Sequence, residues 1–189
     1  FEIPSGRMSV LADDVQPNDL VVSRSGDVYF TETGKGQVTW IDRKGGVHVG
    51  AKGITAPNGI GLSPDHGMLA VSEYTASNVW VFRIRADGSL DAGERYMELR
   101  TPAGSPRSEG DGMTVDADGR YYVTSALGIQ MFDSTGRLSG VIERPQPKGT
   151  VSAAFAGPGM SYLYACSSDR IYRRKLQVKG TPPAVVRKP

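Results

Sequence analysis

The sequence predicts an all-β fold, a β-propeller of four-stranded antiparallel blades, of which about four are present. Three observations predict it. A unit of short strands recurs roughly every 40 to 50 residues, which is the period of a propeller blade. Gly, Asp and Pro turns separate the strands, and no segment keeps a helical period of 3.6 without a Gly or Pro breaking it.

Each unit opens with a polar residue, followed by a strand, a turn and a second strand. The turns Ser25-Gly26, Pro64–Gly67 and Asp118-Gly119 supply the residues that tight hairpins require. Four segments align in this way: residues 18–31, 58–72, 111–124 and, more loosely, 152–167.

A third strand and a second hairpin follow in the first three units, and a fourth strand closes each of them. The third strands are expected at Val38–Ile41, Val79–Phe82 and Ile129–Phe132. We therefore expect a single propeller region over residues 1–189, with blades at approximately 15–55, 56–105, 108–147 and 150–180.

Closure of the ring is the open question. The last unit shows three strands, Ala153–Ala156, Tyr162–Cys166 and Ile171–Val178, while Met8–Ala12 is an additional strand near the N-terminus. That strand either completes the last blade of a four-bladed ring or forms the outer edge of a blade whose remainder lies upstream, and we prefer the second. An unclosed arc leaves two sheet faces uncovered, so association with missing N-terminal blades or with itself is expected.

A generic antiparallel sandwich also has short strands separated by turns. It gives no reason, however, for the same kind of polar residue to precede the same strand in successive units. The repeat therefore favours the propeller.

Composition excludes several classes of function. The formal net charge is +2 and the basic residues are scattered, except for Arg173–Lys175, so no nucleic-acid partner is expected. No apolar stretch approaches the roughly 20 residues of a membrane span, which predicts a soluble protein, cytoplasmic or else periplasmic or secreted. The chain begins with Phe1 rather than Met, as a processed product, an excised domain or a truncated sequence would.

The single cysteine, Cys166, excludes an internal disulfide. It lies in an apolar run, where we expect a small buried hydrophobic residue.

Asn18, Asn58 and Asp111 precede the innermost strand in three successive units. Because innermost strands line the channel of a propeller, these residues should converge at one mouth. Amide and carboxylate oxygens suit Ca²⁺, Mg²⁺, Mn²⁺ or oxygen-ligated Zn²⁺. Each residue alone could serve only as a turn former, but three in register favour a site.

Other polar residues are weaker candidates. Glu32 and Glu73 recur at the ends of second strands, where they line the opposite mouth or hold a turn. His48 and His66 fall in hairpins that we place on the outer parts of blades, as solvated turn residues.

Several motifs carry a family resemblance. The chain resembles the SMP-30/gluconolactonase/luciferin-regenerating-enzyme (regucalcin-like) family over essentially its whole length, as the C-terminal four blades of a six-bladed propeller. The matching segments are Gln16–Leu20 followed by Gly26–Thr31, Pro57–Ile60 followed by Ser63–Asp65, Asp111–Asp116 followed by Gly119, and Phe155–Pro158 with Leu163-Tyr164.

The resemblance implies a hydrolase of sugar lactones such as gluconolactone, acting in carbohydrate metabolism, with one divalent ion at the channel mouth. Ca²⁺ is the first expectation, and Zn²⁺, Mg²⁺ and Mn²⁺ are alternatives. Carried over by position, Asn58 and Asp111 are metal ligands, Asp111 is also the general base, and Asn18 binds and orients substrate or is a further ligand. The ion would polarise the lactone carbonyl and activate a water, whose proton Asp111 accepts.

Two departures from the family pattern matter. The family's metal-binding Glu lies in its first blade, for which this sequence has no equivalent, and Gln16 stands where some lactonases carry an Arg. Substrate preference and activity of the chain by itself are therefore open. The alternatives are a propeller that binds a ligand or protein without catalysis, with an incomplete metal site, and a strictosidine-synthase-like or NHL-type propeller.

Overall fold

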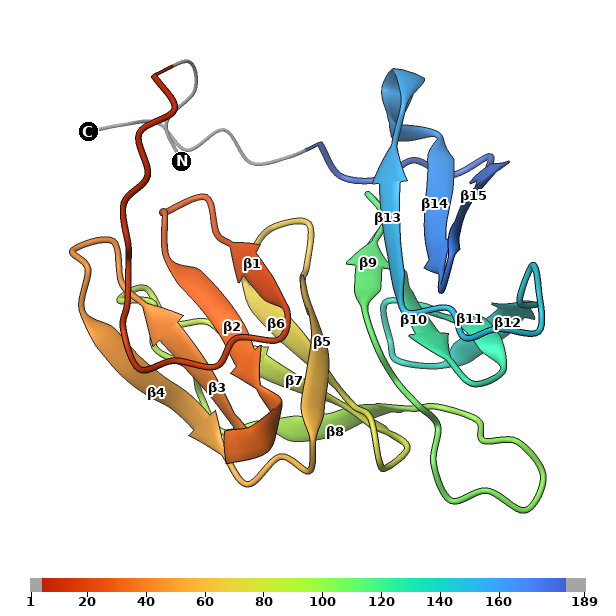
Figure 1. The fold of residues 1–189 in the computed structure, drawn as a ribbon, viewed down its shortest axis with the longest axis horizontal. Helices are drawn as coiled ribbons and strands as arrows, with labels where there is room; N and C mark the ends of the chain where they lie inside the picture. The colour runs from red at the N-terminus through yellow and green to blue at the C-terminus, as the bar shows by residue number, and fades with distance from the viewer. Residues whose placement is uncertain (1–4, 183–189) are drawn as a thin grey trace.

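The computed structural model describes residues 5–182. Its strands form four antiparallel sheets arranged as an arc, with the first strand of each sheet toward the inside (Figure 1). Three sheets have four strands in chain order and the last has three. The all-β propeller architecture predicted from the repeat is confirmed.

The strands divide into blades as follows. Blade 1 contains β1 (Leu20–Val22), β2 (Val28–Glu32), β3 (Gln37–Ile41) and β4 (Val47–Lys52). Blade 2 contains β5 (Pro57–Leu62), β6 (Met68–Glu73), β7 (Asn78–Arg83) and β8 (Glu94–Glu98). Blade 3 contains β9 (Met113–Val115), β10 (Tyr121–Ser125), β11 (Gly128–Phe132) and β12 (Leu138–Ile142). Blade 4 contains β13 (Ser152–Ala156), β14 (Tyr162–Ser167) and β15 (Arg170–Lys175). The 3₁₀ turns η1 (Thr33–Lys35) and η2 (Pro158–Met160) complete the elements, and no helix in the described part of the chain could cross a membrane.

The hydrophobic core lies between the blades. Because side chains alternate along a strand, each central strand sends apolar residues to the blades on both sides. In β10, for example, Val123 packs toward blade 2 and Tyr122 toward blade 4. The blades are thus stacked face to face, which fixes the register of neighbouring inner strands.

The hairpins owe their shape to carboxylates. In the β9–β10 turn, Asp116 accepts the backbone N–H groups of Asp118 and Arg120, each at 3.0 Å, and Gly119 takes a φ of 82°. This is the turn chemistry that the sequence pattern predicts.

Four expectations need correction. Residues 8–12 form no strand: Met8, Val10 and Leu11 are exposed, so neither burial nor ladder hydrogen bonds hold them extended. The strand expected to reach Val178 ends at Lys175, because the chain turns there and Val178 packs against the core between blades 3 and 4.

Cys166 is exposed rather than buried, because it lies on the face of blade 4 that points away from blade 3. His66 is not in an outer hairpin. It lies in the inner hairpin between β5 and β6, where its Nδ1 accepts the N–H of Arg24 at 3.0 Å. His48, in contrast, is in the outer strand β4 and pairs with Asp42.

Candidate functional site

The three predicted site residues occupy equivalent positions in blades 1 to 3. Asn18 and Asp111 lie two residues before β1 and β9. Asn58 lies inside β5, where the register with β6 shifts between Pro57 and Ile60. Such a bulge re-aims side chains at the end of a strand, so all three residues sit at the same end of the inner strands.

Hydrogen bonds from Thr31 join blade 1 to blade 2 at this end. Its backbone oxygen accepts the N–H of Asn18 at 2.8 Å, and its Oγ1 donates to the carbonyl of Asn58 at 2.6 Å. A single residue of β2 therefore holds the backbone of Asn18 in its own blade and that of Asn58 in the next.

Ser72, the equivalent residue of β6, makes the next link. Its Oγ accepts the N–H of Gly59 at 2.9 Å and donates to the carbonyl of Asp111 at 3.0 Å. The two backbones approach so closely that a Cβ on Gly59 would lie 2.1 Å from the Asp111 carbonyl oxygen, which only glycine avoids. The structure thus brings together the backbones of Asn18, Asn58 and Asp111.

The carboxyl group of Asp111 has a raised pKa. Burial raises its pKa to about 6, the N–H of Gly112 at 2.9 Å partly opposes the rise, and the negative charge of Asp19 adds to it. A pKa in this range allows a carboxylate to exchange protons near neutral pH.

Asp19 is a member of this cluster that the sequence analysis missed. Its carboxylate accepts the N–H groups of Ile60 at 3.2 Å and Leu20 at 2.9 Å, and burial raises its pKa in spite of these bonds. The signal was present in the repeat, because Asp19 takes the position that glycine holds in the other two units, as Gly59 and Gly112. Asp19 thus departs from the repeat by placing a carboxylate where the two equivalent residues have no side chain.

Asn58 is the second unusual side chain. Only 8% of its surface is exposed, yet its amide group makes no hydrogen bond to any residue between 5 and 182. The amide atoms are not among the fully buried polar atoms without a partner in the described part of the chain, so they keep contact with solvent and have capacity for a ligand. Asn18, in contrast, is exposed at the rim.

The oxygen groups of Asn58, Asp111 and Asp19 are of the hard type that Ca²⁺ and Mg²⁺ prefer. Among the described residues, however, no three His, Cys, Asp or Glu side chains are grouped closely enough to hold a metal ion. The residues present fit two or three positions of a coordination shell, and the others would come from water, substrate or groups beyond these residues.

Glu32 and Glu73 hold loops at the same mouth as Asn18 and Asn58, and not at the opposite mouth. Glu32 accepts a hydrogen bond from the N–H of Gln16 at 2.9 Å and forms an ion pair with Lys35 at 2.7 Å. Glu73 accepts a hydrogen bond from the N–H of Thr55 at 2.9 Å. Each buried carboxylate ties the loop that leads to a rim residue to the second strand of the same blade.

An arc of propeller blades with oxygen-bearing side chains at one mouth defines a β-propeller with a candidate polar site. The family model described as "SMP-30/Gluconolactonase/LRE-like region" matches residues 2–169. The chain belongs to this family.

Two curated relatives and two solved structures give the extent of the similarity. A gluconolactonase of Zymomonas mobilis is 27% identical over 87% of this chain and 51% of its own length. The pentonolactonase XacC of Haloferax volcanii is 29% identical over 80% of this chain and 53% of its own. The chain therefore spans about half the length of these relatives.

Among solved structures, a gluconolactonase of Xanthomonas campestris superposes with a TM-score of 0.71 at 27% identity, over 85% of this chain and 57% of that one. A calcium-binding protein of Agrobacterium tumefaciens, regucalcin, superposes with a TM-score of 0.76 at 20% identity, over 91% and 65% of the two chains. The second similarity concerns the fold alone.

Proposed function

We propose that this chain carries part of the active site of a metal-dependent hydrolase of sugar lactones. The observation that supports it is the juxtaposition on adjoining blades of Asn58, a largely buried residue whose amide has no hydrogen-bond partner among residues 5–182, and Asp111, whose pKa is raised to about 6. Two relatives that bear the names gluconolactonase and pentonolactonase give the substrate class.

In this proposal Asn58 and Asp111 are ligands of one divalent cation, Ca²⁺ being the first to test, with Zn²⁺, Mg²⁺ and Mn²⁺ as alternatives. The cation, when bound, supplies Lewis acidity at the lactone carbonyl. The negative charge of Asp19 also favours a cation beside Asp111, because Asp19 lies close enough to raise the pKa of Asp111.

Asp111 acts as the general base. A water oxygen bonds to the carbonyl carbon while Asp111 accepts the water proton, the ring ester C–O bond breaks, and the proton passes to the departing oxygen to give the open hydroxy acid. Asn18, exposed at the rim, contacts the hydroxyl groups of the sugar through its amide.

Proton release from δ-gluconolactone tests the proposal. The assay uses the chain with Ca²⁺, Zn²⁺, Mg²⁺ or Mn²⁺, before and after chelation, and compares Asp111→Ala with Asp133→Ala, a partly buried turn carboxylate of blade 3. We expect cation-dependent release that Asp111→Ala reduces at least about 100-fold and Asp133→Ala leaves unchanged. Release that survives chelation or Asp111→Ala would contradict the mechanism.

A propeller that binds its ligand without hydrolysis is the second candidate, and the lack of a three-residue acidic or imidazole group among residues 5–182 favours it. It predicts that the chain binds the cation or the lactone, and loses binding in Asp111→Ala, while the lactone is recovered unchanged. Calorimetric titration beside the proton-release assay separates the two functions.

A further inference from the structure

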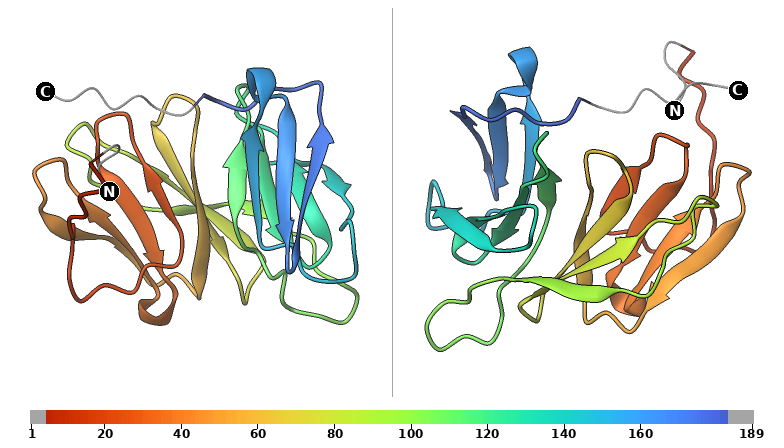
Figure 2. Two further views of the ribbon diagram at one scale, coloured as in Figure 1. Left: turned by 45° about the horizontal axis from the view of Figure 1, so that its top comes forward. Right: turned by 180° about the vertical axis from the view of Figure 1, so that it is seen from behind.

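Blade 4 ends on a free strand edge. The sheets of blades 1 to 3 each have a fourth strand, whereas the sheet of blade 4 ends at β15, and no strand within residues 5–182 pairs with its outer side (Figures 1 and 2). An unpaired edge is a template for another strand.

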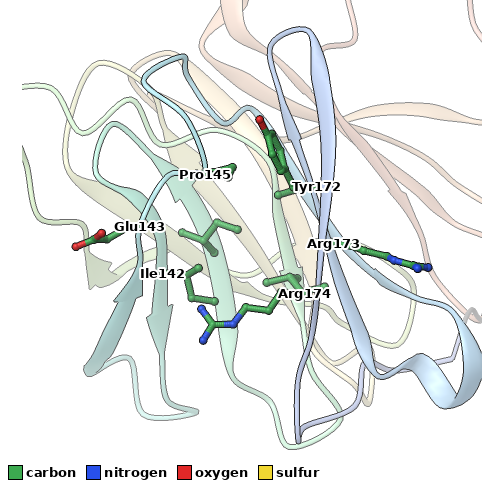
Figure 3. Close-up of a pocket in the computed structure, with 9 residues that line it drawn as sticks. Ile142, Glu143, Pro145, Tyr172, Arg173 and Arg174 are labelled. Atoms are coloured by element: carbon green, nitrogen blue, oxygen red, sulfur yellow. The ribbon is translucent and has the colours of Figure 1, made fainter.

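A cavity of about 310 Å³ lies beside this edge, between blades 3 and 4 (Figure 3). Its walls are the apolar side chains of Ile129, Ile142, Leu163 and Ala165, with Arg174 reaching toward Ile142. In blade 3 the fourth strand supplies Leu138 to the core shared with the preceding blade. Blade 4 has no such strand, so the space that an apolar side chain would fill is open.

Residues 8–14 have the complementary character. Met8, Val10 and Leu11 are 75%, 70% and 65% exposed, and no strand pairs with them in the described part of the chain. Asp13 and Asp14 follow at once. The edge strand carries four exposed cations, Arg170, Arg173, Arg174 and Lys175. An apolar segment with an acidic end matches an apolar cavity whose charged lining residues are two arginines, Arg173 and Arg174, and one carboxylate, Glu143.

The segment does not pair with β15 of its own molecule, because residues 5–14 run along blade 1, at the other end of the arc from β15 (Figures 1 and 2). We propose that β15 accepts residues 8–12 of a second copy of this chain as the fourth strand of blade 4. Because the donor and acceptor surfaces differ, this contact is head-to-tail and can continue from copy to copy.

Charge reversal tests the pairing. One variant carries Asp13→Lys with Asp14→Lys, and the other carries Arg173→Glu with Arg174→Glu. Each should be monomeric alone, because segment and edge then repel each other. An equimolar mixture should associate again, because the segment of each variant is opposite in charge to the edge of the other. Sedimentation velocity over a concentration series measures all three samples and the unchanged chain.

Tyr74→Ser is the matched control. It alters an exposed hydrophobic side chain directly after β6, in a blade that has neighbours on both sides, and should leave association unchanged. The proposal is overturned if the unchanged chain is monomeric at all concentrations, if the charge-reversed variants still associate alone, if their mixture stays monomeric, or if Tyr74→Ser abolishes association.

Discussion

Replacing Asp111 with Asn should stabilise the folded chain at neutral pH while it removes the proposed function. Burial raises the pKa of Asp111 from 3.8 to about 6, so the folded state prefers the protonated carboxyl. A group of this kind contributes its full stability below the unfolded pKa, and the contribution is lost as the pH rises through the folded value. The neutral amide of Asn keeps an acceptor for the Gly112 N–H and does not ionise.

The size of the effect follows from the shift. A rise from 3.8 to about 6 corresponds to about 3 kcal/mol if each unit is worth about 1.4 kcal/mol. Because Asp111 is only partly buried, solvent screening reduces this figure, and we expect ~1 kcal/mol. Asp111→Asn should thus raise the free energy of unfolding by about 1 kcal/mol above pH 6 and leave it nearly unchanged below pH 4.

Urea unfolding between pH 4 and pH 8, in chelator, measures this difference. Asp133→Asn is the control, because hydrogen bonds from Thr135 and Arg137 lower the pKa of Asp133 below 3.8, so its loss should cost stability to a similar extent throughout this pH range. An Asp111→Asn variant that is less stable than the unchanged chain at pH 7, or equally altered at all pH values, would refute the electrostatic account of the site.

Three further changes test how the rim is held together. Gly59→Ala places a Cβ 2.1 Å from the Asp111 carbonyl oxygen and should lower the free energy of unfolding by about 2 kcal/mol or more. Gly149→Ala, which has open space around its Cβ position, should leave the free energy of unfolding nearly unchanged. Equal costs for the two variants would argue against the close approach of the two backbones. Thr31→Val removes the 2.6 Å bond to the Asn58 carbonyl and should cost about 1–2 kcal/mol, measured by urea unfolding, with weaker cation binding in calorimetry. Burial alone would raise the pKa of Glu32, but bonds from Lys35 and its neighbours lower it to about 2, so Glu32→Gln should destabilise above pH 4.5 and lose its effect as the pH falls from 4.5 toward 2, as followed by thermal unfolding.

The blade pattern could be predicted because it rests on local chemistry. Turn residues such as Gly26 and Gly119 adopt φ values of 91° and 82°, and the strand alternation between them sets which residues enter the core. The equivalence of Asn18, Asn58 and Asp111 followed from the same repeat, since residues in one register of successive blades lie side by side.

Features set by contacts between blades could not be predicted from the sequence. The proximity of Asp19 to Asp111 depends on how closely blades 1 to 3 approach, and nothing local to Asp19 reveals it. The exposure of Cys166 and the absence of a strand at residues 8–12 both depend on surfaces that no described residue covers. In each case the local pattern was compatible with burial, but the partner surface decides the outcome.

The central claim is that side chains from separate blades form one cation site. Calorimetric titration with Ca²⁺ of the unchanged chain, Asn58→Ala, Asp111→Ala and the double variant tests it most directly. The account predicts that each single change weakens binding at least about tenfold and that the double change weakens it less than the product of the two, as for ligands of one ion. Absence of Ca²⁺ binding by the unchanged chain, or independent and additive effects of the two changes, would contradict it.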